Sequence, residues 1–216
     1  MYINKSVALK QQDFILWLFC NNLKQRGNTM KKSLFAVVAL VFATSALAEG
    51  NYAGIKLETR DGRASTADSN VFSMTVGKNI NQYLNAEIYT RLKNEDGTDS
   101  NNTRLEGALI GSVATPINGL SVYTRGAMGK KFDHTSDYNY WSVEPGMKYA
   151  VTGDLALKAG VRFRDAFNNA NNDSTRTYRL GAEYALDKTQ TLSVGFDRSL
   201  GNAEFNAFSA GYGIKF

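Results

Sequence analysis

Apolar and polar residues alternate along most of the chain from residue 49 onward, and a helical period is almost absent. In "LALKAGVRF", residues 155–163, the odd-numbered positions are apolar and the even-numbered ones are small or charged. A period of two is typical of a strand with one apolar and one polar face. The pattern predicts ten strands, over residues 52–60, 71–79, 83–93, 103–115, 119–130, 138–150, 154–165, 176–186, 190–199 and 205–216.

The connections between these strands alternate between tight turns and longer polar loops. The turns centre on residues 81, 117, 152 and 188, whereas "NEDGTDSNN" and "NNANNDST" are two of the loops. Strands of about 10 residues, tilted near 40°, rise roughly 25 Å, which is the height of the apolar band of an outer membrane. An even number of strands, with turns at one end and loops at the other, predicts an antiparallel up-and-down β-barrel.

The aromatic residues distinguish a soluble sandwich from a membrane barrel. A sandwich packs its apolar faces inward, whereas a membrane barrel turns its apolar face to lipid and gathers aromatic residues at the two rims. By strand parity, every Phe well inside a strand lies on the apolar face. Aromatic residues on that face near strand ends are Trp141, Tyr149, Tyr178, Tyr184 and Phe216. The all-β fold is therefore predicted to span a membrane.

A three-part export signal precedes the strands, at residues 30–48. Two lysines follow Met30, an apolar run covers 34–42, and Ala46-Leu47-Ala48 forms a small-x-small cleavage site. This is the pattern of a secretory signal peptide, and its apolar run is too short to cross a bilayer. We interpret 49–216 as the exported protein and 1–29 as an untranslated extension upstream of the true start.

Removal of residues 1–48 changes the charge and the candidate chemistry. The exported part keeps 19 of 25 basic and 19 of 20 acidic residues, so its formal charge is zero and the pattern predicts no nucleic acid partner. Cys20, the single cysteine, is also removed. The single histidine, His134, lies in the loop "KKFDHTSDY", and its neighbours Asp133 and Ser136 set no catalytic geometry by adjacency alone. We predict no cofactor, no metal site and no enzymatic activity.

The export signal, the succession of hairpins and the final segment "NAFSAGYGIKF" resemble the bacterial outer-membrane β-barrel class. The resemblance covers 49–216 and is to the small OmpA-like, OmpX-like and porin-like members. It implies a Gram-negative outer membrane, both termini in the periplasm, and contact with lipid and lipopolysaccharide. It also implies that the barrel-assembly machinery reads the last strand, at Gly211, Tyr212, Ile214 and Phe216.

The polar face would line the lumen of such a barrel. By parity it carries twelve basic residues, Lys56, Arg60, Arg91, Lys93, Arg104, Arg125, Lys148, Lys158, Arg162, Arg164, Arg179 and Lys215. It carries six acidic residues, Glu58, Glu87, Glu106, Glu144, Glu183 and Asp197. The outer loops are assigned ten acids, among them Asp165 and Asp173, against Arg63, Lys130, Lys131 and Arg176. A basic lumen beneath an acidic rim is predicted.

Two functions fit this charge distribution. Inward basic residues would guide small anionic solutes through a narrow porin-like passage, with inward glycines leaving room. Alternatively, Arg–Glu networks fill the lumen, and a closed barrel serves a structural or surface-binding role through its acidic loops. Six acids cannot pair with twelve bases one to one, so the surplus requires water, bound anions or loop acids that fold inward.

Two residues depart from the strand pattern. Arg198 shares the parity of the lipid-facing residues near the outer end of its strand, where it would contact lipopolysaccharide phosphate or extend into water. Pro145 lies inside the strand 138–150 and lacks the N–H that a sheet uses. We predict a bulge or a local break at Pro145–Gly146.

Overall fold

The computed structural model describes residues 50–63, 66–95, 101–133, 137–171 and 173–216. The predicted export signal and the upstream extension lie outside these residues. All ten predicted strands are confirmed: β1 Asn51–Gly62, β2 Ser69–Asn81, β3 Leu84–Glu95, β4 Asn101–Ala114, β5 Leu120–Phe132, β6 Tyr138–Ala150, β7 Leu155–Ala166, β8 Thr175–Ala185, β9 Gln190–Gly201 and β10 Phe205–Lys215. One short helix, η1 Asn169–Asn171, lies between β7 and β8. Within the described ranges, no helix has the length and apolar character to cross a membrane.

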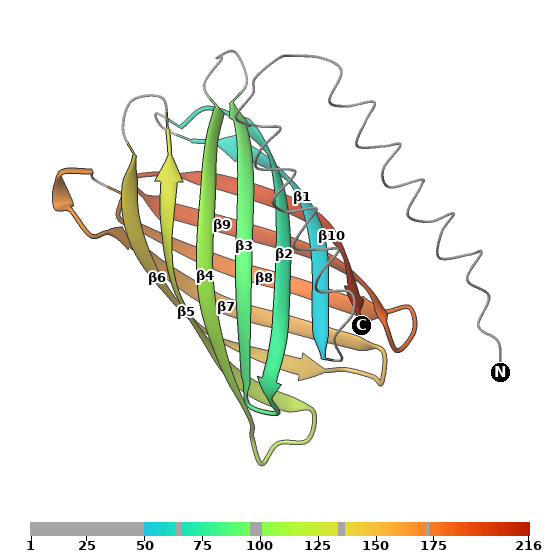
Figure 1. Ribbon diagram of the computed structural model, residues 1–216. Helices are drawn as coiled ribbons and strands as arrows, with labels where there is room; N and C mark the ends of the chain where they lie inside the picture. The colour runs from blue at the N-terminus through green and yellow to red at the C-terminus, as the bar shows by residue number, and fades with distance from the viewer. Residues whose placement is uncertain (1–49, 64–65, 96–100, 134–136, 172) are drawn as a thin grey trace. The chain divides into compact units, whose positions relative to one another are not determined.

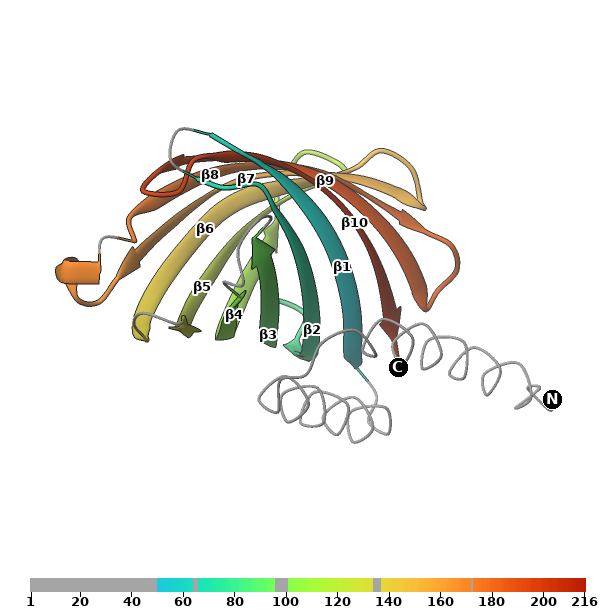
Figure 2. The same ribbon diagram turned by 90° about the horizontal axis from the view of Figure 1, so that it is seen from above.

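The ten strands form one closed antiparallel barrel, as predicted. Each strand pairs with its neighbour in sequence, and β1 pairs with β10 from Tyr52↔Lys215 to Gly62↔Phe205. The backbone N–H of Phe216 donates to the carbonyl oxygen of Asn51 at 2.9 Å, next to this pairing. Figures 1 and 2 show β1 and β10 side by side, with the C-terminus beside the start of β1. The last strand therefore closes the sheet.

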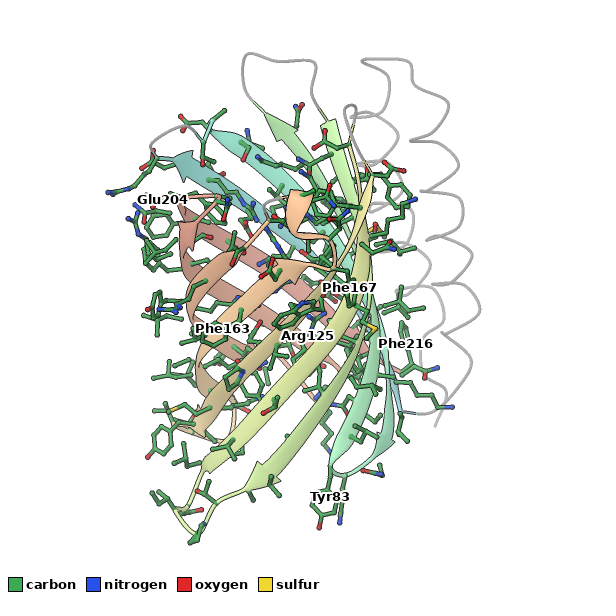
Figure 3. The ribbon with its side chains drawn as sticks, turned by 90° about the vertical axis from the view of Figure 1, so that its left-hand side faces the viewer. Tyr83, Arg125, Phe163, Phe167, Glu204 and Phe216 are labelled. Atoms are coloured by element: carbon green, nitrogen blue, oxygen red, sulfur yellow. The ribbon has the colours of Figure 1, made fainter. Side chains whose placement is uncertain are left out.

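The barrel has a turn end and a loop end. The turn end carries the connections 82–83, 115–119, 151–154 and 186–189 together with Gly50 and Phe216. The opposite end, here called the loop end, carries the start of β2, the ends of β1 and β3, and the described connecting residues 66–68, 167–171, 173–174 and 202–204. In Figure 3, Tyr83 marks the turn end, Glu204 marks the loop end, and Arg125 lies between them.

The outer face of the barrel is apolar and exposed. Leu180 at mid-height is 59% exposed, Val194 is 61% exposed and Phe208 is 69% exposed. Exposed aromatic side chains lie at both ends: Trp141, Phe163, Phe167 and Tyr178 toward the loop end, and Tyr83, Tyr149, Tyr184 and Phe216 toward the turn end. A continuous apolar surface between two aromatic rims is typical of a barrel that contacts lipid.

The prediction at Pro145 is half right. Pairing of β6 with β5 continues without a shift through Thr124↔Pro145 and Tyr123↔Gly146. Pairing with β7 stops after Val143↔Phe163 and resumes at Gly146↔Gly160 in the same register. The local break exists, since Pro145 has no N–H to donate, but the predicted bulge is wrong because no extra residue enters the strand.

Candidate functional site: the charged lumen

Polar side chains from strands that are not neighbours contact each other. Arg162 on β7 donates from Nη2 to Glu106 Oε2 on β4 at 2.7 Å. Lys148 on β6 donates from Nζ to Glu183 Oε2 on β8 at 2.9 Å. In a closed barrel, side chains from strands that are not neighbours can contact each other only across the concave, inner side of the sheet. The polar face of the strands therefore lines the lumen.

Glu106 stands at the centre of a buried ion-pair chain. Its Oε1 lies 2.6 Å from Arg125 Nη2, and its Oε2 accepts the bond from Arg162. Arg125 Nε also lies 3.4 Å from Glu87 Oε2. Glu106 is 1% exposed, so its charge is retained in a buried environment by two guanidinium groups. This chain joins β3, β4, β5 and β7 across the middle of the lumen.

The half of the lumen toward the turn end is paired but more open to water. Lys148 and Lys158 both contact Glu183, at 2.9 and 2.5 Å, with side chains 42% and 39% exposed. At the middle of the lumen, Arg179 contacts Glu144 at 2.7 Å and Asp197 at 3.3 Å. Lys148 and Lys158 therefore remain accessible to a solute even though each has a carboxylate partner.

The half toward the loop end is buried and contains an acid that strand parity did not place there. Asp173, assigned to the outer loops, is 7% exposed, and its Oδ1 lies 2.6 Å from Arg164 Nη2 and 4.0 Å from Arg104 Nη2. Burial opposes ionisation of Asp173, but the attraction of Arg164 and Arg104 leaves the pKa of this carboxyl below its ordinary value. A loop acid therefore folds inward, which is one of the three ways to balance the surplus of bases.

A second group of ion pairs, centred on Glu58 of β1, lies near the loop half of the lumen. Glu58 is 5% exposed; its Oε2 lies 3.0 Å from Lys56 Nζ, and its Oε1 accepts a bond from Arg60 Nε. Arg91 is 5% exposed and directly opposite Arg104 on the neighbouring strand. Among the residues that the structure describes, no carboxylate lies within ion-pair distance of Arg91.

Several residues assigned to loops belong to strands. Lys130 and Lys131 lie in β5, Asp165 lies in β7 and Arg176 lies in β8. Lys131 pairs in register with Arg104 and Tyr138, so it shares their lumen-facing side. The alternation of residues continues past residue 130, and extending the predicted strand by one position would have placed Lys131 in the lumen.

Inward glycines accommodate tyrosine rings, which changes the expectation that they leave room for a solute. A Cβ on Gly77 would lie 2.2 Å from the ring of Tyr52, and one on Gly146 would lie 2.4 Å from the ring of Tyr123. In each case the tyrosine and the glycine are opposite each other on neighbouring strands. The hydroxyl groups of Tyr52 and Tyr123 donate to Glu87 at 2.7 Å and Glu144 at 3.3 Å. These rings narrow the lumen.

The remaining candidate residues lie outside the lumen or carry no site. Arg198 donates from Nη1 to Asn206 Oδ1 at 2.9 Å toward the loop end of β9. Tyr212 donates to Gln190 Oε1 at 2.7 Å, and it lies with Gly211 and Ile214 toward the turn end of β10. No group of His, Cys, Asp or Glu within the described ranges could hold a metal ion, and His134 lies outside them.

Comparison with known proteins identifies the architecture. No protein-family model matches the sequence, and no curated protein matches it. The NanC porin matches over 76% of this chain and 100% of its own length, with a TM-score of 0.53 and 12% identity. The fold is that of an outer-membrane β-barrel.

Two further solved structures have lower scores. The translocator domain of the autotransporter NalP from Neisseria meningitidis covers 87% of this chain and 96% of its own, at 10% identity and a TM-score of 0.48. The KdgM porin in complex with disordered oligogalacturonate matches over 76% of this chain and 99% of its own length, at 14% identity and a TM-score of 0.46.

Proposed function

We propose that this protein resides in a bacterial outer membrane and forms a narrow porin-like passage that prefers small anions. The observation that supports the proposal most is the excess of basic over acidic side chains on the lumen face. Arg91 adds a buried base without a described carboxylate partner, while Lys148 and Lys158 remain accessible toward the turn end. On this proposal the loop end faces outward and both termini lie in the periplasm.

Inward cations favour anions through the field that they create in a narrow, low-dielectric passage. An anion that enters at the turn end meets Lys148 and Lys158 first and the Arg125–Glu106–Arg162 chain next. Because Tyr52 and Tyr123 cover the inward glycines, only a small solute would pass. Selectivity would therefore come from both charge and width.

Planar-bilayer recording tests this function. We expect small single-channel currents and, in a salt gradient, a reversal potential of the sign that anion preference gives. Changing Lys148 and Lys158 together to Gln should lower the anion-to-cation permeability ratio by roughly two-fold or more, because two accessible positive charges are lost. Arg176→Gln, on the outer face, is the matched control and should leave the ratio unchanged. Cation preference in the wild type would contradict the proposal.

A closed barrel is the second candidate, and the packing of the lumen from its middle toward the loop end favours it. Tyr140 is 0% exposed, Glu106 is 1% exposed and Ser142 is 2% exposed, so side chains fill this part of the lumen. On this alternative the acidic loops would bind partners at the cell surface while the barrel serves as their scaffold. Folded protein, recognised by heat-modifiable mobility on gels, that gives no current in bilayers would support this candidate over the passage.

The outer face would contact lipid and lipopolysaccharide. Arg198 and Arg176 lie at the loop end of the outer face, and the guanidinium carbon of Arg176 is 5.4 Å from the ring centroid of Phe163. Guanidinium groups form charge-assisted bonds with phosphate, which lipopolysaccharide carries at this depth. We propose a phosphate contact for Arg198 on this basis.

The last strand is proposed to carry the signal for the barrel-assembly machinery. Phe216→Ala keeps the backbone bonds of residue 216 and removes an aromatic ring. Full burial of a Phe side chain stabilises a folded protein by about 1.5–3 kcal/mol. We expect the amount of folded barrel in cells to fall severalfold more than the yield of unassisted refolding into vesicles. Phe216→Tyr, which keeps an aromatic ring, is the control and should assemble normally. Equal losses in cells and in vesicles would show a stability effect alone.

A further inference from the structure

Three arginines lie in the loop half of the lumen, and two of them lie over the ring of one tyrosine. Arg91 on β3 and Arg104 on β4 are directly opposite each other, and Arg104 shares the Oδ1 atom of Asp173 with Arg164 of β7. The ring centroid of Tyr140 lies 5.4 Å from the guanidinium carbon of Arg104 and 5.8 Å from that of Arg164. The three arginines, here called the arginine cluster, are 5%, 6% and 9% exposed.

The arginine cluster has more hydrogen-bond donors than acceptors. Among the described residues, Asp173 is the one acid within ion-pair distance of the cluster, and its Oδ1 serves both Arg164 and Arg104. The Nε atoms of all three arginines and Nη1 of Arg104 are buried without a hydrogen-bond acceptor in the described structure. Buried charged donors without acceptors are destabilising, because neither water nor protein replaces the lost hydration.

The single carboxylate of Asp173 relieves only part of the repulsion within the cluster. Like charges directly opposite each other on neighbouring strands destabilise a sheet, and the effect increases in a low-dielectric interior. In the same row of the sheet, Lys131 is opposite Arg104 on its other side and lies 2.8 Å from Asp133. A row of three bases, Arg91, Arg104 and Lys131, thus crosses β3, β4 and β5 in the described structure.

A bound anion would satisfy the free donors and reduce the repulsion together. The planar guanidinium fork matches the oxygens of carboxylate, sulfate and phosphate groups. We propose that the arginine cluster of Arg91, Arg104 and Arg164 binds a small oxyanion from solution, and that Asp173 occupies part of this site as a tethered carboxylate. An incoming oxyanion binds at Arg91 and competes with Asp173 for Arg104.

This inference rests on the proposed function, since the anion reaches the cluster through the same lumen, but binding can be measured without any current. The experiment is calorimetric titration of the folded barrel in detergent with sodium sulfate, at neutral pH and constant ionic strength. We expect one saturable site. Arg91→Gln should weaken sulfate binding about ten-fold or more, since it removes the guanidinium of the cluster that no described carboxylate contacts.

Two further variants separate the site from general charge. Asp173→Asn should bind sulfate about five-fold or more tightly than the wild type, because the tethered competitor is neutralised. Arg176→Gln removes a basic residue at the same end of the barrel but on the outer face, and it should bind as the wild type does. Folding is checked by unfolding in sulfate-free buffer, where Arg91→Gln should be at least as stable as the wild type because a repulsion is lost.

The outcomes are distinct. The site is overturned if the wild type shows no saturable binding, if Arg91→Gln binds sulfate as tightly as the wild type, or if Asp173→Asn binds it no more tightly. Saturable sulfate binding by protein that carries no current retains the site and removes the passage. Anion-selective current without saturable sulfate binding retains the passage and removes the site.

Discussion

Replacing Glu106 with Gln should destabilise the folded barrel by about 3–5 kcal/mol, the usual cost of removing one partner from a buried ion pair. Glu106 is 1% exposed and its two oxygens contact Arg125 and Arg162 at 2.6 and 2.7 Å. The variant leaves Arg162 buried without a carboxylate among its described contacts, whereas Arg125 keeps Glu87. The measurement is reversible denaturant unfolding in lipid vesicles, followed by the fluorescence of Trp141.

Glu183→Gln provides the matched control for Glu106→Gln. Glu183 also contacts two bases, Lys148 and Lys158, but all three side chains are between 26% and 42% exposed. Water screens such pairs, so this variant should cost about 1 kcal/mol or less. Similar losses for the two variants would mean that water reaches Glu106 in the folded protein, which would contradict a filled middle of the lumen.

The barrel could be predicted from the sequence because lipid selects for a pattern that continues through every strand. An apolar residue at every second position, as in β7, fixes which side chains face outward, and the parity of Arg162 and Glu106 then places them inside. Turns recurring about every 36 residues give the strand count. These features depend only on local order along the chain, so a single sequence contains them.

The pairing within the lumen could not be predicted in the same way. Which inward residues meet depends on the stagger of the closed sheet, a global property that no single strand specifies. The contact of Arg162 on β7 with Glu106 on β4 follows from that stagger. Asp173 was missed for another reason: it lies in a connection, where alternation assigns no face.

The strongest test of the membrane assignment is a polar substitution at an exposed residue, because such a change would have little effect on stability in a water-soluble protein. Leu180 lies at the middle of β8 and is 59% exposed on the outer face. In a water-soluble protein, a polar substitution at such a site usually changes stability by less than about 0.5 kcal/mol. In a bilayer the same position is near the hydrocarbon midplane, where an arginine costs about 2–4 kcal/mol.

Leu180→Arg should therefore lower the free energy of unfolding in lipid vesicles by about 2–4 kcal/mol, because the guanidinium must enter hydrocarbon or distort the bilayer around it. Leu186→Arg makes the same chemical change in the turn between β8 and β9, at a residue 49% exposed, and should cost about 1 kcal/mol or less because the turn lies at the interface. Equal costs at the two positions would contradict a lipid-facing middle. A loss confined to Leu180 would locate the hydrocarbon between the two aromatic rims, since depth is the main difference between the two variants.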